Sequence, residues 1–429
     1  MTRAGLAVHR TFHSLWHSRN FRLFFSGQAV SVSGTWMQMV ASAWLVLRLT
    51  GSGVALGIET ALAFGPILVL GAWGGALADR HDKRRLLMAT QAAYALLALA
   101  LFAIVAADVA RLWMVYALAL GQGVVTAIDQ PTRHSFFAEM VEPRDLANAI
   151  SLNSAVMTGT RIVGPALAGA LIAGVGMEWC FLLNGVSFLG VIGALGAMRT
   201  DELRPQRAPR EGPAIREGLR YVWRTPQLRR PLVLMAALYL FSFNYSVLMP
   251  LFAERTFDGD AGTLGTLLSV MGVGSLAGAL TLAGRTAPNE RRLAIAAIAV
   301  GIVSALVAFA PTLGSAVVAM VPLGFSSIVF MTTANSTLQL SARPDMRGRV
   351  MALYGMVFLG STPIGGPISG WVGEHLGART GLAGGGAIAI ATGMIGLWLL
   401  SRRRKAERIE LGSHRSAEPE LATARELSA

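Results

Sequence analysis

Long apolar runs separated by short charged turns follow one another along almost the whole chain. Each run is about 18 to 25 residues long, the length at which an α-helix crosses the hydrocarbon core of a bilayer. We expect twelve such helices, at residues 23–47, 54–78, 86–107, 112–128, 147–175, 179–198, 232–253, 264–283, 293–310, 316–334, 350–372 and 382–400. The pattern therefore predicts an all-α membrane protein of twelve transmembrane helices.

A polar segment rich in arginine and proline interrupts the pattern between the sixth and seventh runs. The predicted organisation is a cytoplasmic N-terminus, a six-helix bundle, a cytoplasmic loop, a second six-helix bundle and a basic, disordered tail, at residues 1–22, 23–198, 199–230, 231–401 and 402–429. The first run begins only after Arg19 and Arg22 and is too long for the apolar part of a signal peptide. We expect it to stay in the mature protein.

Composition and charge agree with this assignment. Of the residues, 53% are hydrophobic and 48 are glycines, which suit membrane helices because small residues let helices approach closely. The net charge of +13 would suggest nucleic-acid binding in a soluble domain. However, 32 of the 37 Lys and Arg residues lie in the N-terminus, the tail and the loops on one side. This asymmetry predicts that both termini are cytoplasmic and leaves no basic surface for nucleic acid.

The two halves of the chain resemble each other. Residues 135–152 are similar to residues 336–353, and Val163-Gly164-Pro165 corresponds to Gly365-Gly366-Pro367 with a shift of one residue. A repeat of about 200 residues with the same topology in both halves predicts two bundles related by an axis along the membrane normal. A substrate path is then expected between them.

The turn between the second and third runs carries a dense group of charges, in the stretch Gly75-x-Leu77-Ala78-Asp79-Arg80-x-x-Lys83-Arg84-Arg85. This stretch resembles the signature of the major facilitator superfamily, and the resemblance covers residues 15–400. Asp82 stands where the family has a glycine, and the second-half copy of the motif, near residues 284–292, lacks the acid. The resemblance implies the major facilitator fold and a transporter.

Two further motifs narrow the resemblance. The stretch Gly159-x-x-x-x-Gly164-Pro165-x-x-x-Gly169 resembles the helix-5 motif of the superfamily's exporters. Asp129-x-Pro131-x-Arg133, together with Arg161, is most similar to the branch of enterobactin exporters and macrolide-efflux proteins. The resemblance implies that the protein is located in the bacterial cytoplasmic (inner) membrane.

The charged turn is predicted to act as a conformational latch. A carboxylate at Asp79 is placed to face the unpaired N–H groups at the N-terminus of helix 11, which the resemblance puts near Arg349. Such a contact contributes roughly 0.3 to 2 kcal/mol, enough to bias two conformers of similar energy. The predicted latch comprises Gly75, Asp79, Arg80, Arg84, Asp129 and Arg133, with Arg80 or Arg84 linking the two acids. The alternative is a solvated loop that only fixes the topology.

The resemblance to the superfamily's exporters implies that helix 5 seals the route to the inner side. Pro165 removes a helical hydrogen bond, and Gly159, Gly164 and Gly169 leave a strip without side chains against a neighbouring helix. The alternative is ordinary close packing.

Titratable groups within the spans are few. The histidines lie in tails, loops or span ends, and among the acids Glu59 is the one clearly inside a span. Because a carboxylate in the membrane is costly, we expect Glu59 to carry the coupling proton. The alternative is a structural pair with Arg161.

The substrate cavity is predicted to be largely apolar and aromatic, with Trp36, Phe241 and Phe243 on its wall. The polar candidates are Arg161, Gln28, Gln38, Gln122, Asn244, Tyr245, Thr333 and Asn335. Arg161 is expected either to meet an anionic or hydroxyl-rich substrate or to hold helices together. The other polar residues are equally compatible with hydrogen bonds between helices.

These features favour a secondary-active, proton-coupled exporter of a bulky amphipathic compound of the drug, macrolide or siderophore type. We expect a monomer in the lipid bilayer with a small-molecule substrate and no cofactor or metal, since Cys180 is the single cysteine and no nucleotide-binding loop occurs. The alternatives are an uptake symporter of the same fold and a non-transporting membrane scaffold. An enzyme is disfavoured because no catalytic constellation lies in the spans.

Overall fold

The structure is a computed structural model that describes residues 15, 17–142, 144–204, 215–282 and 289–426. Within these residues, twelve helical segments are long and apolar enough to cross a membrane, and no strand is found. The all-α class and the twelve predicted spans are therefore confirmed. Ser18 and Ser52 begin the first two spans as N-caps, because their side-chain oxygens accept backbone N–H groups of the first turn.

The first six spans are single helices. They are α3 (Arg19–Thr50), α4 (Gly53–Arg80), α5 (Lys83–Ala106), α6 (Leu112–Met140), α7 (Leu146–Gly174) and α8 (Glu178–Gly196). Gly51 has φ 60° in the tight turn between α3 and α4, a conformation that glycine adopts without strain.

Two of the second six spans are divided. The helices are α10 (Pro226–Phe241), α11 (Tyr245–Phe257), α12 (Ala261–Leu282), α13 (Glu290–Ala308), α14 (Leu313–Ser341), α15 (Arg347–Gly360), α16 (Thr362–His375) and α17 (Ala378–Glu426). Between α10 and α11, the Asn244 side chain donates to the Leu240 carbonyl at 2.8 Å in place of a backbone N–H. Between α15 and α16, Pro363 has no N–H to donate to the preceding turn.

Several helices are longer than the sequence predicts. The fourth span continues to Met140 rather than residue 128, because the charged residues of its last turns are paired within the bundle. The predicted interior loop contains a short 3-10 helix at Thr200–Glu202 and the amphipathic helix α9 at Ile215–Arg224. α17 continues to Glu426 through the segment predicted as disordered, which is rich in good helix formers such as Ala, Glu, Leu and Arg.

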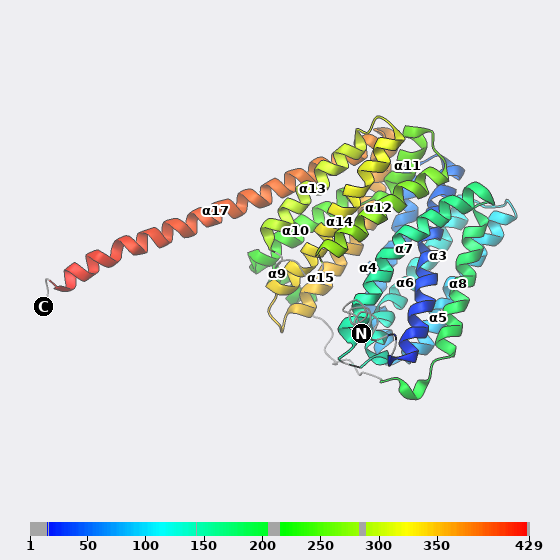
Figure 1. Ribbon diagram of the computed structural model, residues 1–429, viewed down its shortest axis with the longest axis horizontal. Helices are drawn as coiled ribbons and strands as arrows, with labels where there is room; N and C mark the ends of the chain where they lie inside the picture. Colours follow the sequence, from blue (N-terminus) through cyan, green and yellow to red (C-terminus); the bar gives the residue numbers. More distant parts are fainter. Residues whose placement is uncertain (1–14, 16, 143, 205–214, 283–288, 427–429) are drawn as a thin grey trace, which may run out of the picture.

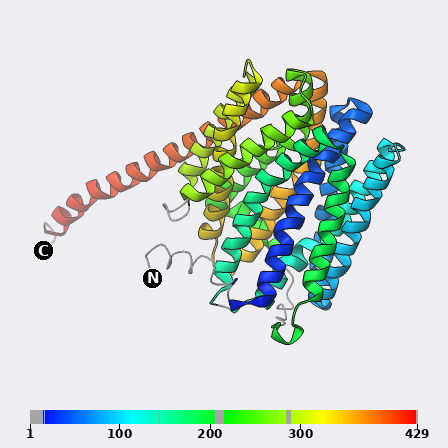
Figure 2. The ribbon, with the colours of Figure 1, turned by 45° about the vertical axis from the view of Figure 1, so that its right-hand side comes forward.

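The spans form two groups that follow the chain. Figure 1 shows α3, α5, α6 and α8 on one side and α10, α13, α14 and α15 on the other, with α17 projecting beyond both, and Figure 2 shows the same division from another direction. The turn at Gly51 and the turn at Asp79 lie at opposite ends of α4, and we use them to name the Gly51 end and the Asp79 end.

Among the described residues, the two halves share a core at the Gly51 end and not at the Asp79 end. One cluster of buried side chains joins α3 and α4 with α11 and α12 there, including Val46, Leu56, Phe252 and Leu264. Toward the Asp79 end, the described core splits. One cluster around Phe24 belongs to the first half, and another around Met235 belongs to the second. The halves are therefore held together at one end.

Two glycine seams make this closure tight. In one seam, α4 lies on α16, and a Cβ added to Gly57 would meet the Gly366 carbonyl and the Pro367 Cα at 2.6 Å. In the other, α7 lies on α12, and a Cβ added to Gly265 would meet the Pro165 carbonyl at 2.6 Å. The Gly-Pro motifs that the sequence identifies as a repeat thus lie at equivalent contacts between the halves.

Candidate functional site

A carboxylate of the second half binds the start of a helix in the first half at the Gly51 end. Glu374 Oε2 accepts the Ser52 hydroxyl at 2.6 Å and the backbone N–H of Val54 at 2.9 Å. The N-terminus of α4 has unpaired N–H groups and the positive end of the helix dipole, so it favours a carboxylate. This Glu374 clamp joins the two halves directly.

An arginine adds a second link at the same end. Arg255, at the end of α11, donates to the Glu374 carbonyl at 3.2 Å and also to the Gly51 carbonyl in the first half. Neither Arg255 nor Glu374 was among the site residues predicted from the sequence. The signal for Glu374 was available, because it stands at the C-terminal end of its span as Asp79 does in α4.

The predicted latch is not formed at the Asp79 end. Asp79 and Arg80 are exposed, and Asp79 has no hydrogen bond or ion pair with the described part of the chain. Arg84 instead donates to the Leu195 and Gly196 carbonyls at 2.6 and 3.0 Å, and so caps the last turn of α8. The role of Asp79 stays a prediction, and residues 284 and 285 of the second-half copy lie outside the described residues.

Asp129 is not at the inner end of helix 4, as the sequence suggested, but eleven residues before the end of α6. It is 3% exposed and binds Arg133 at 2.6 Å, Thr90 at 2.8 Å and Gln91 at 2.7 Å. The structure does not bring it together with Arg80 or Arg84. Asp129 is therefore paired inside the first bundle.

A second buried pair lies near the charged turn and was missed. Lys83, which was not part of the predicted latch, forms an ion pair with Glu139, and both side chains are less than a tenth exposed. Near this turn, two helices approach closely at Gly74, which lies against the Ala127 carbonyl of α6. Gly75, a member of the predicted latch, has open space at its Cβ position.

The helix-5 glycines do not form one strip against one helix. Gly164 lies against Trp36 and the Ser33 carbonyl of α3, whereas Gly169 lies against Gly265 of α12. A Cβ at Gly159 would meet open space. Gly164 therefore packs within its own bundle and Gly169 across the two halves, and their part in gating stays a prediction.

Glu59 and Arg161 are not paired. Glu59 is half-buried in the Gly51 half of α4, beside Thr60 and close enough to Tyr116 for an electrostatic interaction. Arg161 lies in the middle of α7, with its guanidinium carbon 5.2 Å from the centre of the Trp36 ring. The structural alternative for Glu59 is therefore not observed.

Several predicted cavity residues bind each other inside the first bundle. The Gln38 side chain donates to Gln122 at 3.3 Å and accepts from Asn184 at 2.7 Å, so these three residues connect α3, α6 and α8. Gln28 is 2% exposed, and its side-chain oxygen has no hydrogen bond within the described residues. For Gln38 and Gln122, the structure supports the alternative of interhelical bonding.

The remaining candidates lie in the second half. Asn244 closes the break between α10 and α11, Thr333 is buried in α14, and the Asn335 side chain accepts from Gln339 at 2.9 Å. Tyr245 is buried beside Ser327.

An aromatic cluster accompanies these residues. Tyr239 stacks on Phe243 with ring centres 4.8 Å apart and meets Phe358 edge-on at 4.9 Å, and Phe243 stacks on Phe330 at 5.8 Å. The sequence identified Phe243 but not Tyr239, Phe330 or Phe358. Helical position alone does not show which faces of α10, α14 and α15 meet.

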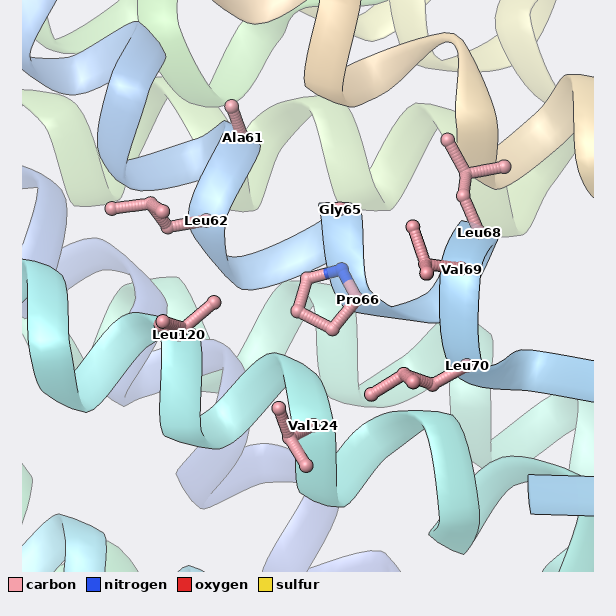
Figure 3. A pocket seen from close by; sticks show the side chains of 9 residues that line it. All are labelled: Ala61, Leu62, Gly65, Pro66, Leu68, Val69, Leu70, Leu120 and Val124. Carbon is pink, nitrogen blue, oxygen red and sulfur yellow. The ribbon is translucent and has the colours of Figure 1, made fainter. Parts of the chain in front are cut away.

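A separate apolar pocket of about 510 Å³ lies between α4 and α6 (Figure 3). Its wall includes Pro66 and Val69, the latter 79% exposed, and none of the predicted substrate residues lines it. The pocket opens on the surface and offers no polar side chain to a ligand. Within the described residues, no group of His, Cys, Asp and Glu is placed to hold a metal ion.

Comparisons with known proteins agree with this fold. A family model described as transmembrane secretion effector matches residues 11–427. The nucleoside transporter NupG has a similar structure, with a TM-score of 0.69 at 12% identity, over 89% of this chain and 98% of NupG.

Three relatives are transporters by name. The multidrug efflux pump Tap of Mycolicibacterium fortuitum is 30% identical over 370 residues, which are 80% of this chain and 87% of Tap. The macrolide efflux protein A of Streptococcus pyogenes is 24% identical over 84% of this chain and 90% of that protein. The staphyloferrin A transporter of Staphylococcus aureus is 25% identical over 61% of this chain, and the match spans 66% of that protein, just under two thirds.

Proposed function

Because the chain belongs to the transmembrane secretion effector family of the major facilitator superfamily, we propose that it exports a bulky amphipathic compound by alternating access. The resemblance stated from the sequence is confirmed. The members of this family are transporters and not enzymes. The names of the relatives support cargo of the drug, macrolide or siderophore type. We place the chain in the bacterial cytoplasmic membrane as a monomer with two six-helix units.

The observation that carries the proposal is that, within the part of the chain that the structure describes, the two halves close at the Gly51 end and not at the Asp79 end. The basic loops and both termini belong to the Asp79 end, and the positive-inside rule puts that end in the cytoplasm. In this orientation the halves are joined on the outside and separate on the inside. An exporter needs this conformer in order to receive cargo from the cytoplasm.

The packing of α4 on α15 and α16 suggests how the other conformer closes. Gly53 lies against Gly370 and Gly57 against Gly366, and farther along Leu68 reaches Gly360, so the two spans run antiparallel. From the contact between Leu68 and Gly360, Asp79 lies eleven residues farther along α4. Eleven residues back from Gly360 on the partner span is the first turn of α15.

In this proposal, each of the two spans has a carboxylate at its C-terminal end, and this carboxylate binds the N-terminus of the other span. Glu374 binds α4 when the outside is closed, and Asp79 binds α15 when the inside is closed. The helix-5 glycines Gly164 and Gly169 support the same movement through the contacts of α7 with α3 and α12.

Glu59 is our proposed proton carrier. It is the acid placed deepest in the spans toward the outer side, and no basic side chain within the described residues forms an ion pair with it. We expect Glu59→Gln to abolish export driven by a pH gradient while counterflow of cargo continues. A variant that kept full gradient-driven export would exclude this role.

Transport into inverted vesicles tests the proposal, with a macrolide and a siderophore as probes. We expect accumulation that depends on respiration and that an uncoupler abolishes. Accumulation that survives the uncoupler in the presence of ATP would exclude proton drive. Accumulation only in right-side-out vesicles would indicate the uptake symporter, and no movement of either probe in either direction would favour a non-transporting scaffold.

A further inference from the structure

Three side chains from both halves lie near the middle of their spans. Arg161 is in the middle of α7 and Trp36 in the middle of α3, while Tyr239 lies in α10 just before the break that divides its span. Superfamily substrates bind near the bilayer midplane between the halves, where such residues can meet a ligand.

Arg161 has a positive charge without a matching acid. Its guanidinium rests on the Trp36 ring, and no carboxylate of the described chain forms an ion pair with it. A cation at mid-membrane depth is costly unless it faces water or an anion. The Trp36 ring packs against the guanidinium, whose fork of N–H donors is suited to binding a further, anionic group.

Tyr239 adds an unused donor on the other half. Its side chain is 7% exposed, and its buried hydroxyl has no hydrogen-bond partner within the described residues. The hydroxyl and the Arg161 guanidinium are close enough to interact electrostatically. A buried hydroxyl left without a partner costs free energy, so a ligand oxygen at this position would be favoured.

The surface beside Tyr239 is aromatic. Phe243 and Phe358 hold the Tyr239 ring from two sides, with ring centres 4.8 and 4.9 Å away. Stacked and edge-on rings of this kind favour a flat apolar group of similar dimensions.

We propose that Arg161, Trp36 and Tyr239 form a subsite for an organic anion, a carboxylate carried on a flat aromatic skeleton. The guanidinium edge binds the carboxylate through two parallel N–H bonds, and the Tyr239 hydroxyl donates to one of its oxygens. The aromatic group of the ligand lies along the wall that Phe243 and Phe358 form. This inference rests on the proposed transport function and names the cargo class of that same route.

Binding of three matched probes to the purified full-length protein in zwitterionic nanodiscs tests the subsite. The probes are 2-naphthoate, 2-naphthamide and 2-naphthylmethylammonium, which share a ring system and differ in charge. By equilibrium dialysis we expect 2-naphthoate to bind at least tenfold more tightly than the amide, and the cation to bind more weakly than either. Equal binding of the anion and the amide would overturn the proposal.

Variants locate the effect. Arg161→Gln is expected to weaken 2-naphthoate binding about tenfold and to leave 2-naphthamide binding unchanged, which also shows that the variant is folded. Arg161→Lys is expected to keep a preference for the anion at lower affinity, because it retains the charge but not the planar pair of donors. Tyr239→Phe should weaken only the anion, by about threefold. An anion preference that persists in Arg161→Gln would refute the assignment.

Transport separates this inference from the proposed function. Export of a macrolide into inverted vesicles together with equal binding of 2-naphthoate and 2-naphthamide would leave the exporter standing and overturn the subsite. Selective 2-naphthoate binding that depends on Arg161, without gradient-driven export of any probe, would support the subsite and contradict the exporter.

Discussion

Neutralising Glu374 should shift the balance between the two conformers of the transporter. The carboxylate is the acceptor of two hydrogen bonds that join the halves, from the Ser52 hydroxyl and the Val54 backbone N–H. Glu374→Gln keeps the shape of the side chain and one acceptor oxygen while it removes the charge. We expect the conformer that is open at the Gly51 end to gain population.

The magnitude follows from the two contacts. A hydrogen bond to a charged group contributes about 1.5 to 3 kcal/mol when it is well buried, and surface charge pairs contribute about 0 to 1 kcal/mol. Glu374 is half-buried, so we assign the clamp about 1 to 2 kcal/mol, including its interaction with the α4 dipole. Loss of this amount changes the ratio of the conformers by a factor of about 5 to 30.

Spin-label distance measurements give this ratio directly. The single native cysteine, Cys180, is buried and is replaced by alanine. Labels at Val109 and Phe309, which are 53% and 71% exposed near the Gly51 end, report the separation of the halves there. In Glu374→Gln we expect a longer-distance population that is rare in the parent protein.

The control and the refuting result use the same pair of labels. Glu178 is also half-buried at the Gly51 end but has no hydrogen bond to the second half within the described residues, so Glu178→Gln should leave the distances unchanged. If Glu374→Gln changes the ratio less than twofold, the clamp does not stabilise the closed end. If Ser52→Ala adds its full effect to Glu374→Gln, the two residues do not act through one bond.

Three further changes test other parts of the structure. Asp79→Asn should remove up to about 2 kcal/mol from the conformer closed at the cytoplasmic end, slowing export into inverted vesicles while cargo binding persists, and unchanged export would contradict the proposed latch. Gly57→Val should prevent closure at the Gly51 end, since the added Cβ would lie 2.6 Å from the Gly366 carbonyl, whereas Gly65→Val, whose Cβ meets open space, should leave the label distances as they are. Asp129→Asn breaks a buried pair and should cost about 3 to 5 kcal/mol of stability, visible as a lower melting temperature in detergent, and an unchanged melting temperature would show that the pair is not stabilising.

The number and order of the spans were predictable from the sequence because hydrophobic length is a local property. The division into two similar halves was also visible in the sequence, and the Gly-Pro repeat marked helices that contact the opposite half. Span ends were less predictable. Asp129, Arg133 and Glu139 look like loop residues by polarity, but Arg133 pairs with Asp129 within α6, and side chains of α5 bind Asp129 and Glu139, so that α6 continues through all three.

The site could be predicted only in part. Residue type singled out Arg161 and Glu59, because charges inside spans are rare and costly. The partners of a polar residue depend on helix rotation, which a sequence without a strong amphipathic pattern does not fix. Gln38 therefore turned out to bind both Gln122 and Asn184. Likewise, the Glu374 clamp joins residues more than 300 positions apart, and no local pattern pairs them.

The glycine seams at the Gly51 end have a consequence for the permeability of the membrane. Where Gly57 and Gly265 touch the facing backbone, no side chain intervenes and no space is left for a file of water molecules. Protons and small ions cross proteins along such water files, so a dry backbone contact blocks their leak even though it carries no charge. In the proposed export cycle, this contact preserves the ion gradients while the other end is open to cargo, and we expect a single methyl group added to a seam to appear first as a leak conductance.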